Sequence, residues 1–257
     1  NSREKEIIGF ENSGHTLFSI VENYKIYNQL KNELKRNKLL KFKNSITYEK
    51  LNKINYDLYI ICDRTHEITK KFFLKNLEKN YDGFAYTSVI KHKKIKKNKI
   101  ASQIFTKNGP LAFLPISDTE TSIVYSFNGN QKIDLNKLIQ KYNTKYSISN
   151  FSNSTAFKLK SSNLRTYYYK NILAFGDLLH RLHPLAGQGF NMTIRDIQDL
   201  NNLIDLKLKN GLDLDNSICE DFQNTTRYKN YLFSSGIDFI YEFFNLETKM
   251  DNNILSK

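Results

Sequence analysis

The sequence is poor in the residues that cross-link a chain or restrict its backbone. Its 257 residues include no tryptophan, two cysteines, three prolines and ten glycines. The two cysteines, Cys62 and Cys219, are far apart, which excludes a disulfide-stabilised scaffold and leads us to expect a reducing, cytoplasmic setting. No apolar run approaches the about 20 residues that a membrane-spanning helix needs, so we expect no transmembrane segment.

The start of the chain has neither an initiator methionine nor a signal-peptide pattern. We therefore expect either a processed protein or the later part of a longer one. Hydrophobic residues make up 40% of the sequence and aromatic residues 13%, which is enough to bury a core and excludes a disordered tail. The length predicts one large domain or two small ones.

The formal net charge of +13 comes mainly from lysine, because only seven of the 39 basic residues are arginine. Arginine is the residue that recognises phosphates and bases in a bidentate manner, so we predict no nucleic-acid partner. The one basic cluster is Lys91–Lys99. Two interpretations stay open for it: the solvated tip of a hairpin, or a contact with an anionic surface such as a membrane.

Hydrophobic periodicity predicts a mixed fold. The block from about 80 to 165 has the pattern of an antiparallel sheet, and the flanking regions have the pattern of strand–helix units, so we predict an α/β domain interrupted by a β-rich insertion. We expect helices over 19–37, 135–142, 187–208 and 221–246, and strands over 56–62, 84–90, 100–105, 111–116, 121–127, 156–160 and 171–175.

All three prolines and four of the ten glycines lie in two stretches, 109–115 and 176–191. In the second stretch an apolar strand ends at Gly176, the carboxylate of Asp177 follows, and a glycine-rich turn opens a long helix. The free N–H groups and the dipole at the start of that helix favour an anionic or electron-rich group. Because Asp177 can also accept hydrogen bonds from ligand hydroxyls, the stretch predicts a cofactor site.

Simpler interpretations of the same stretch compete with this one. Asp177 can merely cap a turn, and the glycines can merely permit tight packing. Asp177, His180 and His183 could bind a metal ion, but a proline and a glycine-rich turn follow them and no third histidine or cysteine is near, so we predict no metal. No Gly-Lys-Ser/Thr sequence is present, which excludes a P-loop.

The run GDLLHRLHPLAGQGFNMTIRD, residues 176–196, resembles the second flavin-binding motif of the para-hydroxybenzoate-hydroxylase-like FAD monooxygenases. It is most similar to the pattern of the ubiquinone-biosynthesis hydroxylases. Three further stretches resemble motifs of that family in the expected order, over roughly residues 10–245. These are Val21–Asn23 for the "VENR" segment, 56–63 for the strand before the "ADG" motif, and 103–115 for the hairpin "QxFTxxGPxAxLP".

The resemblance implies an FAD-binding Rossmann-like domain that lacks its N-terminal dinucleotide unit and is interrupted by an antiparallel substrate-binding sheet. Residues 1–78 would form the partial FAD-binding domain and 79–165 the β-rich substrate domain. Residues 166–257 would return to the FAD-binding domain and add C-terminal helices. By the same resemblance the parent protein is an enzyme that uses FAD, NAD(P)H and O₂ to hydroxylate the aromatic ring of a polyprenylated phenol in ubiquinone biosynthesis.

The family motifs also imply which residues hold the cofactor. Asp177 would bind the ribityl hydroxyls of FAD, Asn191 would lie at the pyrimidine edge of the flavin, and the residues between them would line the isoalloxazine. The dipole at the start of the helix favours the anionic reduced flavin at that edge. Catalytic residues are not assigned. The implied cofactor-binding residues are Asp63, Asp177, Pro184, Gly187, Gln188, Gly189 and Asn191.

The implied partners are a lipophilic phenolic substrate and, as a further expectation, the inner membrane or a quinone-biosynthesis complex at its periphery. The sequence departs from the family in several places. No glycine trio has the GxGxxG spacing, Tyr24 replaces an arginine, Arg64 replaces a glycine, and Leu178–Leu179 replace small residues. These departures motivate an alternative, a catalytically silent subunit of a quinone-biosynthesis assembly. They also predict that this fragment alone binds FAD poorly and is inactive.

Overall fold

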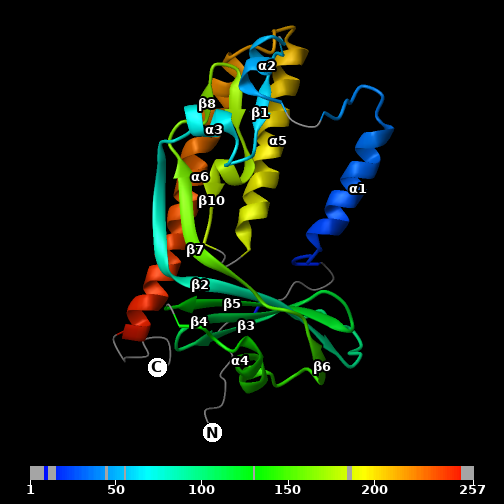
Figure 1. The fold of residues 1–257 in the computed structure, drawn as a ribbon, viewed down its shortest axis with the longest axis vertical. Coiled ribbons are helices and arrows are strands. Elements are labelled where there is room, and N and C mark those ends of the chain that lie inside the picture. Colours follow the sequence, from blue (N-terminus) through cyan, green and yellow to red (C-terminus); the bar gives the residue numbers. More distant parts are fainter. Residues whose placement is uncertain are drawn as a thin grey trace.

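The computed structural model describes residues 9–10, 16–43, 46–54, 56–129, 131–183 and 187–249. The fold is mixed α/β, as predicted, with the sheets divided between an upper and a lower lobe (Figure 1). Two long strands and the C-terminal helix run between the lobes (Figure 1). None of the helices in these ranges is long and apolar enough to cross a membrane.

The upper lobe contains a small sheet in the order β1-β9-β8. Strands β1 (Tyr59–Ile61) and β9 (Ile172–Ala174) are parallel, and β8 (Tyr168–Tyr169) pairs antiparallel with β9. Both parallel strands fall inside the apolar runs that predicted them, but each is only three residues long. Two short helices that the sequence analysis did not predict, α2 (Tyr48–Asn52) and α3 (Glu67–Phe72), belong to the same lobe (Figure 1).

The upper core is built from the apolar residues of β9 and of the segment after it. Leu173 and Ala174 are fully buried, and Leu178 and Leu179 pack in the same cluster with Phe222 of the C-terminal helix. Burying a leucine side chain contributes about 1.5–3 kcal/mol. The two bulky leucines that depart from the family pattern therefore stabilise the core instead of obstructing a site.

The lower lobe is formed mainly by a seven-stranded antiparallel sheet in the order β10-β7-β2-β5-β4-β3, with β6 paired to β2. It confirms the predicted antiparallel block and the predicted hairpin of β3 and β4. Helix α4 (Leu135–Tyr142), confirmed at its predicted bounds, packs on the core of this sheet. The strands are β2 (Asn76–His92), β3 (Ser102–Thr106), β4 (Gly109–Pro115), β5 (Glu120–Asn128), β6 (Ile148–Phe151), β7 (Thr155–Leu164) and β10 (His180–Arg181).

Strands β2 and β7 form a long ribbon that is part of both lobes (Figure 1). Their register shifts between Asn80 and Phe84, where the ribbon turns into the lower sheet. Gly83 lies in this irregularity, opposite β5. A Cβ atom at Gly83 would lie 2.2 Å from the backbone oxygen of Phe127, so only glycine lets the two strands approach there.

The prediction that Lys91–Lys99 is a hairpin tip is wrong. β2 and β3 are not neighbours, because β5 and β4 lie between them in the sheet. β2 already has β5 on one edge and β6 and β7 on the other, which leaves no edge for β3. The connection is also anchored: His92 and Asn98 are buried, and both bond the hydroxyl of Thr121, at 3.0 and 3.2 Å.

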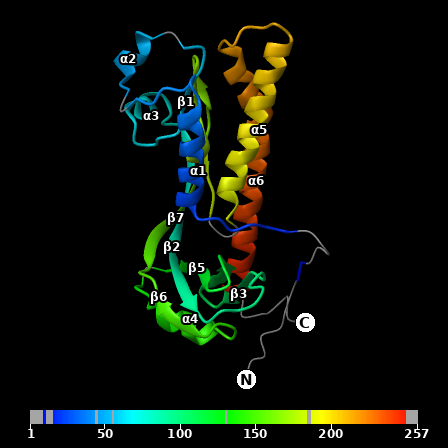
Figure 2. The ribbon, with the colours of Figure 1, turned by 90° about the vertical axis from the view of Figure 1, so that its right-hand side faces the viewer.

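Two long helices cover one side of the ribbon (Figure 2). The short 3₁₀ turn η1 (Gly176–Leu178) follows β9, and α5 (Gln188–Lys209) runs back toward the top of the molecule. Helix α6 (Ser217–Lys249) then descends beside α5 as far as the lower lobe (Figures 1 and 2). Both helices were predicted, and α6 extends beyond its expected start.

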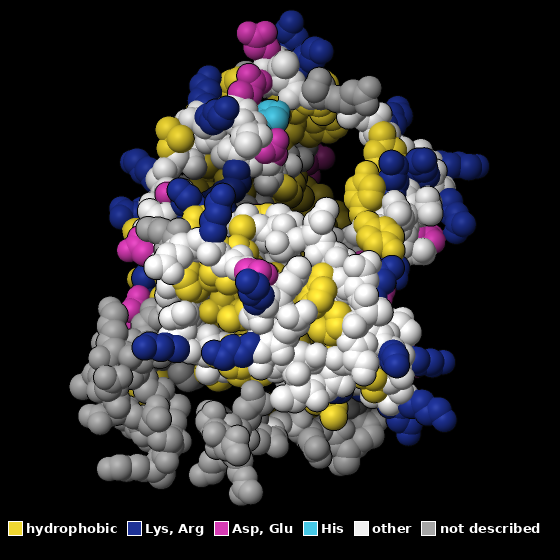
Figure 3. All heavy atoms as spheres, turned by 60° about the horizontal axis from the view of Figure 1, so that its bottom comes forward, with side chains coloured by type: hydrophobic (Ala, Val, Ile, Leu, Met, Phe, Trp, Pro, Cys, Tyr) yellow, Lys and Arg dark blue, Asp and Glu magenta, His cyan; other side chains and the backbone are white. Residues whose placement is uncertain are grey.

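Helix α1 (Asn23–Arg36) stands away from the rest of the molecule and buries none of its residues (Figure 1). The apolar spacing that predicted it forms a stripe that remains exposed. In Figure 3 this stripe lies on the inner side of the helix and faces a hollow. Its members are Val21, Tyr24, Tyr27, Leu30 and Leu34.

We predict opposite effects of alanine at two glycines. Gly83→Ala must push β2 away from β5 and should lower the free energy of unfolding by about 1–3 kcal/mol. In Gly236→Ala of α6 the new Cβ meets no atom of the described residues within 4 Å, and the change should raise the free energy of unfolding by about 0.5–1 kcal/mol. Urea unfolding of the two variants measures both changes, and equal effects would contradict the strand contact at Gly83.

Candidate functional site

Two acidic residues follow the parallel strands of the upper lobe at the same edge of the sheet. Ile61 at the end of β1 pairs with Ala174 at the end of β9, so Asp63 and Asp177 follow neighbouring strand ends. Asp177 is exposed in η1. Partial burial of the Cys62 sulfur raises the pKa of that thiol, and the negative charge of Asp177 raises it further, which places the two loops side by side. Carboxyl ends of parallel strands are where ligands bind in open α/β sheets.

The Asp63 carboxylate is oriented by its own loop. It accepts hydrogen bonds from the backbone N–H of Thr65 at 2.7 Å and from the Thr65 hydroxyl at 2.8 Å. These two bonds hold the pKa of Asp63 below its usual value. Its neighbour Arg64 reaches β7, where its Nη2 donates to Ser162 Oγ at 2.5 Å. Asp63 is therefore an ionised, exposed acceptor whose loop is tied to the ribbon.

Glycines lie directly before α5 and within its first turn. Gly187 has a φ of +60°, a conformation that favours glycine, and directly precedes the helix. Among the described residues, no atom lies within 4 Å of the position that a Cβ would take at Gly187 or Gly189. Asn191 Nδ2 donates to Gln188 Oε1 at 3.0 Å within the exposed first turn. Pro184 lies outside the described residues, and the other four candidates of the turn lie together at this end of the helix.

Asp177 and the start of α5 belong to one site. Gly176 packs toward the second turn of α5, since a Cβ on it would lie 4.0 Å from Thr193 Cγ2. The site therefore combines an exposed carboxylate with the N-terminus of a long helix. A carboxylate accepts bonds from hydroxyls, and free N–H groups with a positive dipole end attract an electron-rich ring edge. These residues fit a flavin with its ribityl chain.

A buried polar trio holds this site in place, and sequence reasoning missed it. His180 of β10 bonds through Nε2 to Asp196 Oδ2 of α5 at 2.5 Å, and both side chains are almost completely buried. The other oxygen of Asp196 accepts from Asn230 Nδ2 of α6 at 3.0 Å. Three elements thus meet at one carboxylate. Removing one partner from such a buried pair costs about 3–5 kcal/mol.

The sequence of α5 already indicated that Asp196 would be buried. Met192, Asp196 and Leu200 recur every four residues and are the buried residues of α5. A carboxylate on the apolar stripe of a helix must find hydrogen-bond donors when it is buried. The sequence does not reveal that His180, sixteen residues earlier, is one of them.

His183 lies in an aromatic cluster between β2 and α6. Its ring meets Tyr81 edge-on with 4.6 Å between centroids and Tyr241 with 4.4 Å. Burial lowers the pKa of His183 to about 4, and the positive charge of Lys79 contributes to the shift. Tyr81 also bonds Ser161 Oγ at 2.9 Å and Asp238. The segment that precedes the glycine-rich turn is therefore fixed against the ribbon by a neutral histidine.

The three side chains considered as metal ligands have other surroundings. Asp177 is exposed, His180 bonds Asp196, and His183 packs between tyrosines. In the described part of the chain no three histidine, cysteine or acidic side chains are grouped to hold a metal ion.

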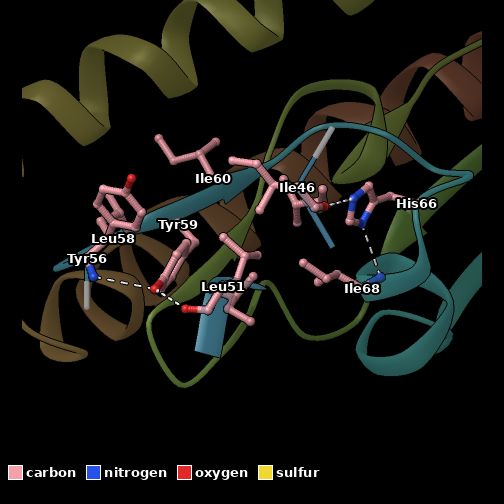
Figure 4. A pocket seen from close by; sticks show the side chains of 10 residues that line it. Ile46, Leu51, Tyr56, Leu58, Tyr59, Ile60, His66 and Ile68 are labelled. Atoms are coloured by element: carbon pink, nitrogen blue, oxygen red, sulfur yellow. Dashed lines mark hydrogen bonds between the residues drawn. The ribbon is translucent and has the colours of Figure 1, made fainter. Parts of the chain in front are cut away.

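A pocket separate from the flavin site lies at the edge of β1 (Figure 4). It is a mainly apolar pocket of about 380 Å³, and Tyr59, Ile60 and Ile61 all line it. Because neighbouring strand residues point to opposite faces, a pocket that touches all three runs along the strand's edge. Among the described strands only β9 pairs with β1. The His66 ring bonds Ile46 O at 3.1 Å and accepts from Ile68 N at 3.2 Å, which fixes one wall (Figure 4).

We predict that His183 contributes to acid unfolding. Its folded pKa of about 4 lies below the unfolded value of about 6.5, so its contribution is complete above pH 6.5 and is lost as the pH falls toward 4. The loss should be about 3 kcal/mol between pH 7 and pH 4. His183→Phe keeps a ring but cannot titrate. Denaturant unfolding over this range should show a flatter pH dependence for the variant, and parallel curves would contradict the prediction.

No family model matches the chain. It is 22% identical over 247 residues to the ubiquinone biosynthesis monooxygenase COQ6 of Schizosaccharomyces pombe. That match covers 77% of this chain and 52% of the relative. It is 28% identical over 184 residues to human COQ6, covering 55% of this chain and 39% of that protein. It is also 28% identical over 153 residues to the 3-demethoxyubiquinol 3-hydroxylase of Escherichia coli, covering 56% and 39%. The chain thus spans about half the length of these relatives or less.

Among solved structures, PqsL, a probable FAD-dependent monooxygenase from Pseudomonas aeruginosa, superposes with a TM-score of 0.55 at 18% identity. The match covers 71% of this chain and 54% of that one. The Diels-Alderase PyrE3 superposes with a TM-score of 0.51 at 15% identity, covering 74% and 46%. By sequence this chain is similar to ubiquinone-biosynthesis monooxygenases, and its described part has the fold seen in the FAD-dependent monooxygenase PqsL.

Proposed function

We propose that this chain provides the isoalloxazine side of the flavin site and the substrate sheet of an FAD-dependent monooxygenase of ubiquinone biosynthesis. In the whole protein the enzyme hydroxylates the aromatic ring of a polyprenylated phenol, with NAD(P)H as reductant and O₂ as oxidant. The observation that carries the proposal is that exposed Asp177 follows Gly176, which lies against the second turn of α5, the helix that begins at the glycine-rich turn. Homology to the ubiquinone-biosynthesis monooxygenases supports it.

The residues of the site would hold FAD in distinct ways. Asp177 would accept hydrogen bonds from the ribityl hydroxyls, and Asp63 offers a second exposed acceptor at the same sheet edge. Gly187 and Gly189 have no Cβ atom that would separate the ring from their backbone. Gln188, Asn191 and, by the family motif, Pro184 would border the ring. Bound FAD supplies hydride acceptance from NAD(P)H and the activation of O₂.

The pyrophosphate-binding part of the site is not provided by this chain, which has no GxGxxG sequence. In the whole protein we propose that the strand of that unit pairs with the free edge of β1 and fills the apolar pocket there. The exposed stripe of α1 would then be covered as well. The matched regions are 39% and 52% of the two relatives' lengths, which leaves room for such a unit.

A catalytically silent subunit is the second candidate, and Arg64 favours it. Arg64 stands where the family pattern has a glycine, and its side chain donates a hydrogen bond to Ser162. A side chain there restricts the close backbone approach that glycine permits. The leucines at 178 and 179 do not argue for this candidate, because both are buried in the core.

We predict that the protein expressed with its upstream coding sequence is a yellow flavoprotein. Asp177→Ala removes the ribityl acceptor and should weaken FAD binding about tenfold or more, because a charge-assisted bond contributes about 1.5–3 kcal/mol. Asp205→Ala is the matched control, since Asp205 is exposed on α5 away from the turn. Flavin fluorescence titration measures both affinities.

Genetic complementation with the same full-length protein distinguishes an active hydroxylase from a silent subunit. An active hydroxylase restores quinone synthesis in a hydroxylase-deficient strain, whereas a silent subunit does not. A colourless full-length protein that added FAD cannot restore, or equal FAD affinity in the Asp177→Ala variant, would contradict the proposed site.

We further propose that the Lys91–Lys99 connection contacts an anionic lipid surface at the membrane periphery. The structure supports this because the connection is held to the sheet, with Lys93 N donating to Ser147 O at 3.0 Å and Ile95 N to Asp118 O at 2.9 Å. Its lysine side chains are exposed, and Ile100 beside them is 71% exposed.

Charge reversal tests this contact. Lys94, Lys96 and Lys97 changed together to glutamate should reduce sedimentation with phosphatidylserine vesicles at least tenfold, because each basic residue near such a surface contributes about 1 kcal/mol. The control reverses the exposed lysines 43, 50 and 53, which makes the same change in net charge. Equal loss in both variants, or none in either, would reject a role for the connection.

A further inference from the structure

The buried His180–Asp196 pair continues toward β7. In the antiparallel pairing of β10 and β7, His180 lies directly opposite Asn163. Directly opposed residues project from the same face of a sheet with their Cβ atoms about 4.5–5.5 Å apart. Since His180 reaches Asp196 of α5, Asn163 also faces the layer of α5 and α6.

Each of these two side chains has one buried polar atom that no described residue satisfies. The atoms are His180 Nδ1 and Asn163 Oδ1. His180 is 1% exposed, so bulk water does not reach its ring. Leaving a buried polar atom unsatisfied costs about 1–3 kcal/mol, and two such atoms on opposed residues call for a shared partner.

We propose that His180 and Asn163 bind one small hydrogen-bonding molecule of the size of water, which completes a chain from Asp196 through His180 to β7. Water suits the site in both protonation states of His180. It donates to Asn163 Oδ1, and it either donates to a neutral Nδ1 or accepts from a protonated one. A buried water with such partners is an ordinary structural component.

This site positions the flavin-binding segments, an assignment that rests on the proposed function. Asp177 lies three residues before His180, and Asp196 lies on the helix that starts at the glycine-rich turn. The backbone adds one bond at the same place, from Leu164 N to Leu179 O at 2.8 Å. The Asp196–His180–water–Asn163 chain therefore fixes both segments to the ribbon that carries the substrate sheet.

The experiment uses NMR of the isotope-labelled chain without FAD. Cross-relaxation should detect a long-lived water at the His180 ring. Asn163→Leu, similar in size but without the acceptor, should abolish that signal and accelerate amide exchange over residues 193–200 of α5 about tenfold. Asn163→Asp keeps an acceptor oxygen and should retain the water. Asn80→Leu, at an exposed site on β2, is the control and should change neither readout.

Absence of the water signal in the unmodified chain would overturn the proposal, and so would an unchanged signal in the Asn163→Leu variant. If Asn163→Leu does not fold, the Asn163→Asp variant still tests the proposal. Retention of the water signal would support it, and loss of the signal would contradict it. In the whole flavoprotein, Asn163→Leu should shift the flavin absorption band and Asn80→Leu should not. A protein without flavin would overturn the proposed function and leave the water site to be judged by NMR.

Discussion

The arrangement of the upper lobe depends on one buried carboxylate. Asp196 lies on the apolar side of α5, and a carboxylate in such surroundings must be met by hydrogen-bond donors. The donors come from β10 and α6, so satisfying Asp196 brings three elements to a single point. These bonds hold α5 against β10 and α6 at Asp196. Apolar contacts alone would allow the helix to slide, because they are not directional.

Sequence reasoning predicted the elements whose hydrophobic period is long and clear. Helix α4, the two long helices, the antiparallel block and the β3–β4 hairpin are all confirmed. The short elements α2, α3 and β10 were missed because two to six residues contain too little periodicity. The partner of β2 was assigned wrongly, since an alternating pattern shows that a strand exists but does not show which strand lies beside it.

The candidate site was predicted in part. Glycine scarcity singled out the turn before α5, and the structure places Gly187, Gln188, Gly189 and Asn191 together at the helix start beside Asp177. The supporting residues His180, Asn163 and Asn230 were not predicted, because contacts between residues distant in the sequence leave no local pattern. Where the chain departs from the family motif, nearby residues accommodate the change: Leu178 and Leu179 enter the core, and Arg64 bonds Ser162.

The shared ribbon has a consequence for how the protein is made. Asn76 pairs with Leu164 and Thr87 with Thr155, so β2 cannot pair with β7 until the strands between them in the sequence have been synthesised. Closing such long loops costs entropy before the contacts repay it, and folds dominated by distant pairings form slowly. During translation the exposed edge of β2 waits for β7, an interval in which unpaired strands can associate with other chains. The ribbon that joins the two lobes is therefore completed only after β7 has been made.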